Sequence, residues 1–183
     1  SQQDALNHIT VNAFDNLDRQ TSSTPPLDKV TSWQYDANGN ITQRKDAKNQ
    51  TTNYQYDSFN RLTKITYPDT STIIYQYDNR GNLTGMTDPN GSSTYVYDTF
   101  DRMTKATNPY NQSIQYVYNN ADNLIQLTYP DVKLVKYTYD KNDRMLTITD
   151  WNNKIISYTY NDNGRVATRS YPNGITTSYI YDN

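Results

Sequence analysis

Two sets of residues in this sequence could bind a ligand: a stripe of aromatic rings, which could stack on sugars, and arginines that recur at one place of a repeating pattern. A guanidinium donates hydrogen bonds in a planar fork, so a row of arginines can bind phosphates or glycans. Each arginine also follows a stretch that contains a turn carboxylate or amide, and we expect the arginines to pair with turn carboxylates. The four residues are Arg61, Arg102, Arg144 and Arg165.

Metal and catalytic chemistry have little support in the residue types. The segment 36–40 (Asp-Ala-Asn-Gly-Asn) is similar to the start of a calcium loop, but Gly39 stands at loop position 4 instead of 6 and no bidentate Glu follows at the required spacing. His8 is the only histidine and there is no cysteine, which excludes paired-histidine sites and thiolate chemistry. We expect a turn at 36–40, a surface position for His8, and no catalytic, cofactor or metal site.

The composition indicates an ordered chain with little aliphatic core. Leu, Ile, Val and Phe supply about 17% of the 183 residues, a level typical of disorder, yet the net charge is only −2 and aromatic residues reach 13%. No apolar run is long enough to span a membrane, and 17 basic against 19 acidic residues give no nucleic-acid footprint. The protein should therefore fold around its 19 tyrosines.

Those tyrosines follow a period of 21 residues, once 20, which predicts a repeat architecture. An aromatic residue followed by Asp or Asn recurs at Phe14-Asp15, Tyr35-Asp36, Tyr56-Asp57, Tyr77-Asp78, Tyr97-Asp98, Tyr118-Asn119, Tyr139-Asp140, Tyr160-Asn161 and Tyr181-Asp182. Another ring stands two residues before most of these, at Trp33, Tyr54, Tyr75, Tyr95, Tyr116, Tyr137, Tyr158 and Tyr179. Fifteen of the 19 tyrosines lie in this frame, so residues 1–183 are predicted to be a single array of about eight units.

Each unit is predicted to be two strands and two turns. Segments such as 52–56 and 136–139 alternate with period two and are rich in Tyr and Thr, as expected of half-exposed strands. Three residues after each Asp or Asn comes a residue that tolerates a positive φ, which indicates a type I turn with a left-handed bulge. These residues are Asp18, Gly39, Asn60, Gly81, Asp101, Asp122, Asp143 and Gly164.

A second short strand follows, opened by Arg or Asn and an apolar residue, as in Arg61-Leu62 and Asn82-Leu83. It is expected to end in a second turn that commonly contains proline, which cannot donate to a strand ladder. We further expect each tyrosine ring to pack on the ring of the neighbouring unit, and the open edges of the sheet to favour edge-to-edge self-association.

The unit resembles the YD repeat, also called the RHS repeat, with its pattern Tyr-x-Tyr-Asp-x-x-Gly-Arg-Leu-Thr-x-x-Thr-x-Pro-Asn/Asp-Gly. Segments 75–91 and 158–174 are near-complete copies, and the resemblance covers essentially the whole chain. Departures are Asn119 and Asn161 in place of Asp, and Ala47 and Trp151 in place of the turn proline. The resemblance implies an all-β fold: antiparallel hairpins in one long, curled, spiralling sheet, here a partial open shell.

The resemblance also implies a function. Similar proteins include Rhs polymorphic toxins, Tc toxin shell components and teneurin-like shells, and in the bacterial ones the shell encloses a C-terminal toxin domain. The chain ends within a unit, at residues 181–183, so we expect a fragment of a larger shell from a secreted or cell-surface bacterial protein. Its expected partners are the remainder of that shell and the enclosed toxin. The alternatives are a carbohydrate- or cell-surface-binding module in function and a parallel β-solenoid in fold.

Overall fold

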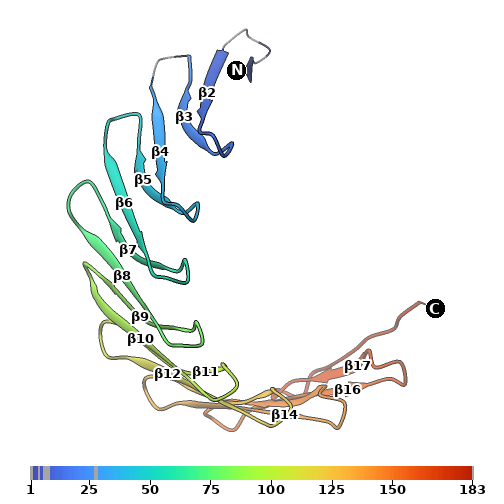
Figure 1. The fold of residues 1–183 in the computed structure, drawn as a ribbon. Helices are drawn as coiled ribbons and strands as arrows, with labels where there is room; N and C mark the ends of the chain where they lie inside the picture. The colour runs from blue at the N-terminus through green and yellow to red at the C-terminus, as the bar shows by residue number, and fades with distance from the viewer. Residues whose placement is uncertain (1, 4, 6–8, 27–28, 183) are drawn as a thin grey trace. The chain divides into compact units, whose positions relative to one another are not determined.

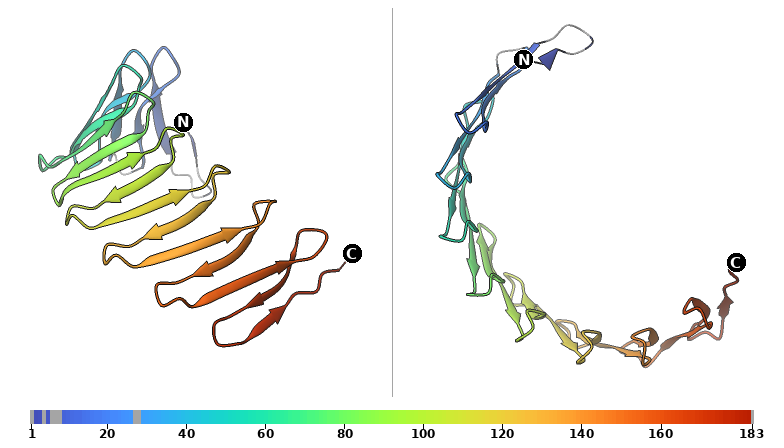
Figure 2. Two further views of the ribbon diagram at one scale, coloured as in Figure 1. Left: turned by 90° about the horizontal axis from the view of Figure 1, so that it is seen from below. Right: turned by 45° about the vertical axis from the view of Figure 1, so that its right-hand side comes forward.

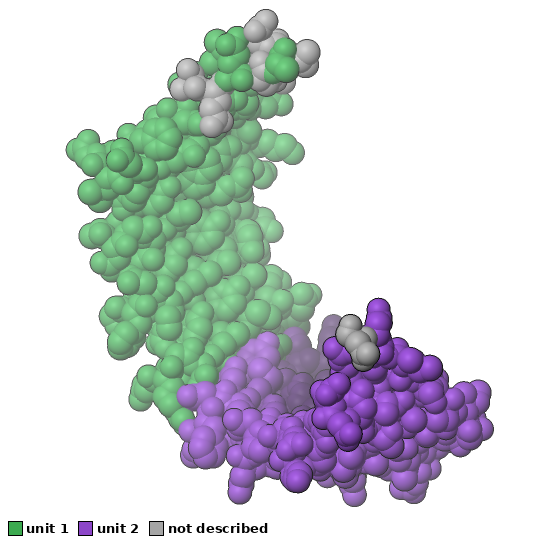
Figure 3. Space-filling model, turned by 90° about the vertical axis from the view of Figure 1, so that its right-hand side faces the viewer, with its two compact units in different colours: residues 1–93 green, residues 94–183 purple. Residues whose placement is uncertain are grey.

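A computed structural model describes residues 2, 3, 5, 9–26 and 29–182. His8 lies outside the described residues. The chain divides into two compact units, residues 1–93 and 94–183, which Figure 3 colours separately. The single array predicted from the sequence stays a prediction, and each unit is described by itself below.

Both units consist of short strands that follow one another along the chain (Figure 1). The first unit holds β1 (Gln2–Gln3), β2 (Ile9–Phe14), β3 (Gln20–Thr24), β4 (Thr31–Tyr35), β5 (Ile41–Lys45), β6 (Thr51–Tyr56), β7 (Leu62–Thr66), β8 (Thr72–Tyr77) and β9 (Leu83–Asp88). Strand β10 (Gly91–Tyr97) runs across the division. The second unit continues with β11 (Met103–Thr107), β12 (Ser113–Tyr118), β13 (Leu124–Thr128), β14 (Leu134–Tyr139), β15 (Met145–Thr149), β16 (Ile155–Tyr160), β17 (Val166–Ser170) and β18 (Thr176–Ser178).

Within each unit, consecutive strands pair antiparallel, so the predicted all-β hairpin fold is confirmed. The pairing of β6 with β7 and of β7 with β8 sets the pattern, and it recurs in the second unit from β11 to β18. The parallel solenoid alternative is wrong, because a solenoid would stack successive coils in parallel. In both views of Figure 2 the strands of a unit lie side by side in a single layer.

The first turn of each hairpin has the geometry that the sequence predicts. In the turn after β6, the amide of Asp57 donates to the carbonyl of Arg61 at 3.0 Å, and the amide of Asn60 donates to the carbonyl of Asp57 at 3.0 Å. The register shifts between Gln55 and Tyr56, which is the expected bulge. The predicted positive φ is confirmed at Asp18, Gly39, Asn60, Gly81, Asp101, Asp122, Asp143 and Gly164.

The second turns repeat the same geometry, which the sequence analysis missed. After β7, the amide of Tyr67 donates to the carbonyl of Ser71 at 2.9 Å, and the amide of Thr70 donates to the carbonyl of Tyr67 at 3.0 Å. Positive φ angles recur ten residues after the first-turn positions, at Asn49, Thr70, Asn111, Val132, Asn153 and Gly174. The loop between β9 and β10 is shorter and differs, with a φ of 129° at Gly91. Thr and Val are β-branched and rarely adopt this conformation, so two of the second turns are strained.

The single layer leaves almost nothing fully buried. Among the described residues, Val135 is the one buried apolar residue, with 8% of its surface exposed. Strand burial alternates instead between half-buried and exposed positions, as along β12, where Tyr116 and Tyr118 are half-buried and Val117 is exposed. Stability must therefore come from many partly buried contacts and not from one core.

The prediction that rings of neighbouring units pack on one another is wrong. Strand β7 lies between β6 and β8, so Tyr54 pairs with Ile65 and Tyr75 pairs with Met86. Equivalent rings are two strand spacings apart, about 9–10 Å, which exceeds the roughly 4.5–7 Å of a ring pair. Most of the first rings therefore face apolar side chains across the strand ladder, whereas Trp33 and Tyr158 face Arg44 and Arg169.

Candidate functional site

The recurrent arginine joins each hairpin to the next one, as Arg61 illustrates. Its Nε donates to Asp57 Oδ2 at 2.7 Å, within its own turn. Its Nη1 donates to the carbonyl of Asp78 in the following turn at 2.9 Å. The guanidinium also lies 4.7 Å from the ring centroid of Tyr77, and Phe59 lies 5.3 Å away. The arginine is thus held by both turns and stacked against an aromatic ring.

The tyrosine of the following hairpin returns a bond to the strand that the arginine opens. The hydroxyl of Tyr77 donates to the carbonyl of Leu62 at 3.0 Å. Arg61 therefore reaches forward to Tyr77 and Asp78, and Tyr77 reaches back to the residue after Arg61. We call this set of an Asp, an Arg and the next Tyr a latch.

Three further latches have matching distances. Arg19, Arg102 and Arg144 donate from Nε to Asp15, Asp98 and Asp140 at 2.7, 2.8 and 2.7 Å. Their guanidinium carbons lie 4.6, 4.8 and 4.6 Å from the rings of Tyr35, Tyr118 and Tyr160. The hydroxyls of these tyrosines donate to the carbonyls of Gln20, Met103 and Met145 at 2.7, 3.0 and 2.7 Å.

Where asparagine replaces the arginine, half of the latch remains. Asn40 Nδ2 donates to Asp36 Oδ2 at 2.9 Å and to Asn60 Oδ1 in the following turn at 2.8 Å. The hydroxyl of Tyr56 still donates to the carbonyl of Ile41 at 3.0 Å. The short amide supplies no cation over the tyrosine ring, so these units depend on the tyrosine bond.

The expected pairing of the arginines with turn carboxylates is confirmed for Arg61, Arg102 and Arg144 and wrong for Arg165. Asn161 replaces the aspartate there, and its Oδ1 accepts from the backbone amide of Arg165 at 2.9 Å. The guanidinium of Arg165 lies over the ring of Tyr181 at 5.2 Å. Arg102 gains a second carboxylate, Asp122 of the next turn, at 2.7 Å.

The latch determines the electrostatics of its carboxylates and phenols. The hydrogen bond from the Arg102 side chain holds the pKa of Asp98 below its ordinary value, although partial desolvation opposes it, and the amides of Arg102 and Phe100 add to the lowering. Arg144 lowers the pKa of Asp140 in the same way. Removal from water raises the pKa of the Tyr118 and Tyr160 phenols, so both remain protonated donors at neutral pH.

These contacts show what the latch can do chemically. Its carboxylates accept from backbone amides and arginine, its arginines are stacked, and its hydroxyls donate to carbonyls, so the groups serve one another. In the part of the chain that the structure describes, no group of three or more His, Asp or Glu residues could hold a metal ion. No helix among the described residues is suited to crossing a membrane.

The structure places the sequence-predicted residues in four positions of the repeating hairpin. The first rings lie within the strands, at Tyr54, Tyr75, Tyr95, Tyr116, Tyr137 and Tyr158. The second rings end the strands, at Tyr35, Tyr56, Tyr77, Tyr97, Tyr118, Tyr139 and Tyr160. The first turns hold Asp36, Asp57, Asp78, Asp98 and Asp140, and the left-handed positions hold Gly39, Asn60, Gly81 and Gly164.

A second cluster of side chains, at two neighbouring second turns, was missed by the sequence analysis. The turns at residues 129–133 and 150–154 bring Tyr129 and Trp151 together, with ring centroids 6.1 Å apart and planes at 82°. Lys133 Nζ lies 5.3 Å from the Trp151 ring centroid and 2.6 Å from Asp131 Oδ2. The sequence carries one signal for this cluster, namely that Trp151 replaces a turn proline.

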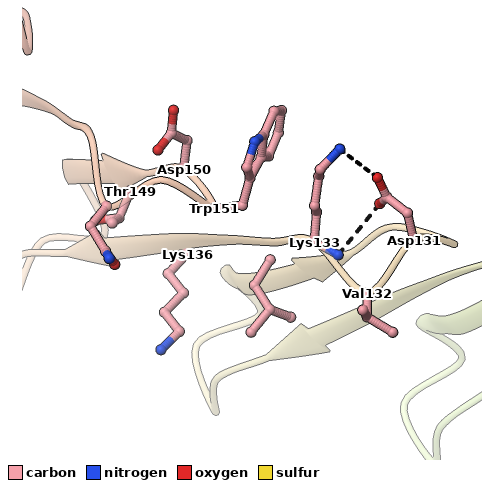
Figure 4. A pocket seen from close by; sticks show the side chains of 9 residues that line it. Asp131, Val132, Lys133, Lys136, Thr149, Asp150 and Trp151 are labelled. Atoms are coloured by element: carbon pink, nitrogen blue, oxygen red, sulfur yellow. Dashed lines mark hydrogen bonds and ion pairs between the residues drawn. The ribbon is translucent and has the colours of Figure 1, made fainter.

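Two hollows adjoin this cluster, and Asp131, Lys133 and Trp151 line both. One, of about 410 Å³, extends to Thr149, Asp150 and Asn153. The other, of about 450 Å³, extends to Tyr129 and Pro130. Figure 4 shows the side chains of Asp131, Lys133, Asp150 and Trp151 standing on one side of the strands and that of Lys136 on the other.

The repeat in the sequence matches a known family. The family model described as RHS Repeat matches residues 14–51, 35–72, 56–93, 77–113 and 118–155. No curated protein matches the chain.

Solved structures of Tc toxins share the fold. The chain is similar to a crystal structure of TcdB2-TccC3, with 20% identity and a TM-score of 0.62 over 81% of this chain and 10% of that one. It is similar to a Photorhabdus luminescens Tc holotoxin pore, with 16% identity and a TM-score of 0.56 over 92% of this chain and 12% of that one. It is also similar to TcdB2-TccC3 without its hypervariable C-terminal region, with 13% identity and a TM-score of 0.52 over 96% of this chain and 12% of that one. The chain thus spans about a tenth of the length of these proteins.

Proposed function

Because this chain belongs to the RHS repeat family, we propose that it is a wall segment of a β-shell that encloses a C-terminal toxin domain. In this proposal the parent protein is a secreted or cell-surface bacterial toxin of the Rhs or Tc type. The segment itself is structural and carries no catalysis.

The observation that carries the proposal is the latch. Its polar groups bind within the turn or to the next hairpin, as in Asp57, Arg61 and Tyr77. An active site needs groups left available for substrate, whereas a wall needs each element tied to its neighbour. The sequence-predicted tyrosines, turn aspartates and left-handed residues are therefore proposed to be structural.

The repeat register supports a single array. The 21-residue spacing continues from Phe14-Asp15 to Tyr181-Asp182 through both compact units, with one 20-residue step. We propose that the remainder of the shell continues this array and that the enclosed toxin contacts it. Stability of such an array should depend mainly on contacts between neighbouring repeats.

The test is cryo-electron microscopy of the natural protein that contains this sequence, together with limited proteolysis. We expect a hollow β-shell, with the C-terminal domain protected from protease. A variant with latches broken by Tyr77→Ala and Tyr118→Ala should make the C-terminal domain more accessible. A solid particle, or a C-terminal domain that is cleaved freely in the unmodified protein, would contradict the wall function.

A second candidate function is carbohydrate binding. The observation that favours it is the pair of hollows beside Trp151. Those residues lie at the second turns, away from the latches.

A further inference from the structure

We propose that the cluster formed by Tyr129, Asp131, Lys133, Asp150 and Trp151 is a binding site for a neutral oligosaccharide, which stacks a pyranose ring on Trp151. The inference deepens the second candidate function and does not depend on the wall function. A shell segment can carry the site on its surface, and a binding module can carry it without any shell.

The first reason is that the cluster departs from the repeat at a turn position where other units have proline. Pro68, Pro109, Pro130 and Pro172 fill the turn position that Trp151 occupies. A proline limits the turn conformation and leaves no large ring in water. Trp151 instead leaves 47% of its surface exposed. Because other repeats form this turn with proline, a tryptophan is not required to make the turn.

The second reason is the shape of the surface. The indole lines both hollows, whose volumes of about 410 and 450 Å³ fall within the roughly 300–1,000 Å³ of small-molecule sites. Tyr129 stands nearly perpendicular to Trp151, so the two rings do not cover each other as a parallel stack would. Aromatic rings beside a hollow can pack against the apolar face of a sugar ring.

The third reason is the polar groups next to the indole. Asp150 Oδ1 accepts from the amides of Asn152 and Lys154, both at 2.8 Å, which fixes the carboxylate in place. No described residue donates to its Oδ2, which is therefore available to accept from a ligand hydroxyl. Lys133 stands on the same side of the strands (Figure 4) and supplies ammonium donors. A fixed acceptor and a donor beside an aromatic platform fit the hydroxyl groups of a sugar.

The charges favour a neutral ligand. Two lysines line the hollows: Lys133 is neutralised by Asp131 at 2.6 Å, and Lys136 stands on the opposite side of the strands from the indole (Figure 4). On the side of Trp151 the cluster therefore offers no unpaired cation to a sulfate or phosphate. Asp150 adds a negative charge on the same side, which would repel an acidic sugar. A neutral glycan avoids both costs.

The test uses the whole chain with Trp33→Phe, so that Trp151 is the remaining tryptophan, and cellohexaose, chitohexaose and maltohexaose as probes. We expect at least one of the three to change the Trp151 fluorescence saturably, with a matching heat in isothermal titration calorimetry. Calorimetry should give the same dissociation constant with and without the Trp33→Phe change.

Two variants locate the site by calorimetry. Trp151→Pro restores the residue of the other turns, so folding should be kept while affinity falls by about tenfold or more, the loss expected for a removed stacking ring. Asp150→Asn keeps the turn, because Asn108 accepts from the amides of Tyr110 and Gln112 in the equivalent turn. This variant should weaken binding severalfold, since an amide nitrogen or a neutral oxygen replaces one acceptor.

Several results would overturn the inference. These are no saturable binding of any of the three neutral probes at millimolar concentration, or binding that Trp151→Pro leaves unchanged. Tighter binding of a heparin hexasaccharide would show an anion site, and tighter binding of a proline-rich decapeptide would show a peptide groove; either would reject the neutral glycan. Protection of the C-terminal domain from protease does not bear on these outcomes, so the two proposals fail separately.

Discussion

The two ends of the strands use the same turn geometry for different purposes. At the first-turn end, described here as the latch end, Asp, Arg or Asn and a following Tyr recur from hairpin to hairpin. At the second-turn end, the same backbone bonds hold Asp46, Tyr67, Asn108 or Asp150 at the first position of the turn. Asp46, Asn108 and Asp150 accept from amides of their own turns, as the latch aspartates do, whereas Tyr67 has no such acceptor. The turn therefore forms without a carboxylate or amide at its first position, and the constant side chains of the latch end serve to join hairpins.

Acid should have the largest effect, because it protonates several latch carboxylates at once. It also acts at the second turns, where the pKa values of Asp46, Asp69 and Asp131 are lowered too, so substitutions at the latch end are needed to separate the two ends. Asp98 and Asp140 have lowered folded-state pKa values, so their stabilisation is present above the unfolded value of 3.8 and is lost as pH falls through the folded value. The urea concentration at the midpoint of unfolding should therefore decrease once the pH is lowered below about 4. Asp98→Asn with Asp140→Asn should flatten this dependence, as Asn119 and Asn161 occur there naturally. An unchanged pH profile would show that the latch carboxylates are not linked to folding.

Among the substitutions, removing one tyrosine ring at each end should give the largest difference in the free energy of unfolding between the two ends. Tyr77→Ala removes a half-buried ring, the bond to Leu62 and the contact with Arg61, and should lower the free energy of unfolding by about 3 kcal/mol. Tyr67→Ala removes the same residue type from a second turn, where the ring is 38% exposed, and should cost about 1 kcal/mol. Urea unfolding followed by circular dichroism measures both. Equal losses would remove the distinction between the ends.

The left-handed turn positions should respond in opposite directions. Gly81 has a φ of 98°, so Gly81→Val should destabilise the chain by about 1–2 kcal/mol. Val132 has a φ of 60° and is strained as a β-branched residue, so Val132→Asn should stabilise it by about 1 kcal/mol. Asn153 already occupies the equivalent place. Thermal unfolding of the two variants checks the signs, and Asn79→Ala, in the same turn as Gly81, is the control.

The arginine and asparagine forms of the latch should differ least. Asn40→Arg would place a guanidinium near Asp36 and within reach of the Tyr56 ring, and should stabilise the chain by about 0.5–1 kcal/mol. Arg61→Asn should cost about 1 kcal/mol, because the contact with Tyr77 is lost while a bond to Asp57 remains possible. Stabilisation by both changes, or by neither, would contradict the role of the cation over the ring.

The sequence predicts the strands and the first turns because both depend on local patterns. Alternating Tyr and Thr indicate the strands, and Gly, Asn or Asp at a fixed place indicates the positive φ. The left-handed residues of the second turns also had a local signal. Asn49, Asn111 and Asn153 each follow the left-handed residue of the preceding first turn by ten residues. Thr70 and Val132 obscure it, because β-branched residues indicate extended backbone.

The contacts between hairpins were harder to predict, because they join residues that are distant in sequence. Arg61 was expected to find a turn carboxylate, but its stacking on Tyr77 requires knowing which ring lies beside it in space. The prediction that rings of neighbouring units pack on one another was wrong for the same reason, because an intervening strand separates equivalent rings. The contact between Tyr129 and Trp151 joins two different turns, and neither composition nor periodicity gives the distance between those two rings.

One second turn has a consequence for how such a chain changes in length. The 20-residue step from Asp78 to Asp98 contains the tight loop between β9 and β10, where only Pro89 and Asn90 separate the strands. A missing residue was thus accommodated at the end that carries no latches, and the first turns on either side kept their form. Deletions, insertions and grafted peptide loops should accordingly be tolerated at the second turns. The second turns are therefore the positions where both natural variation and protein engineering should be able to change the length of the chain.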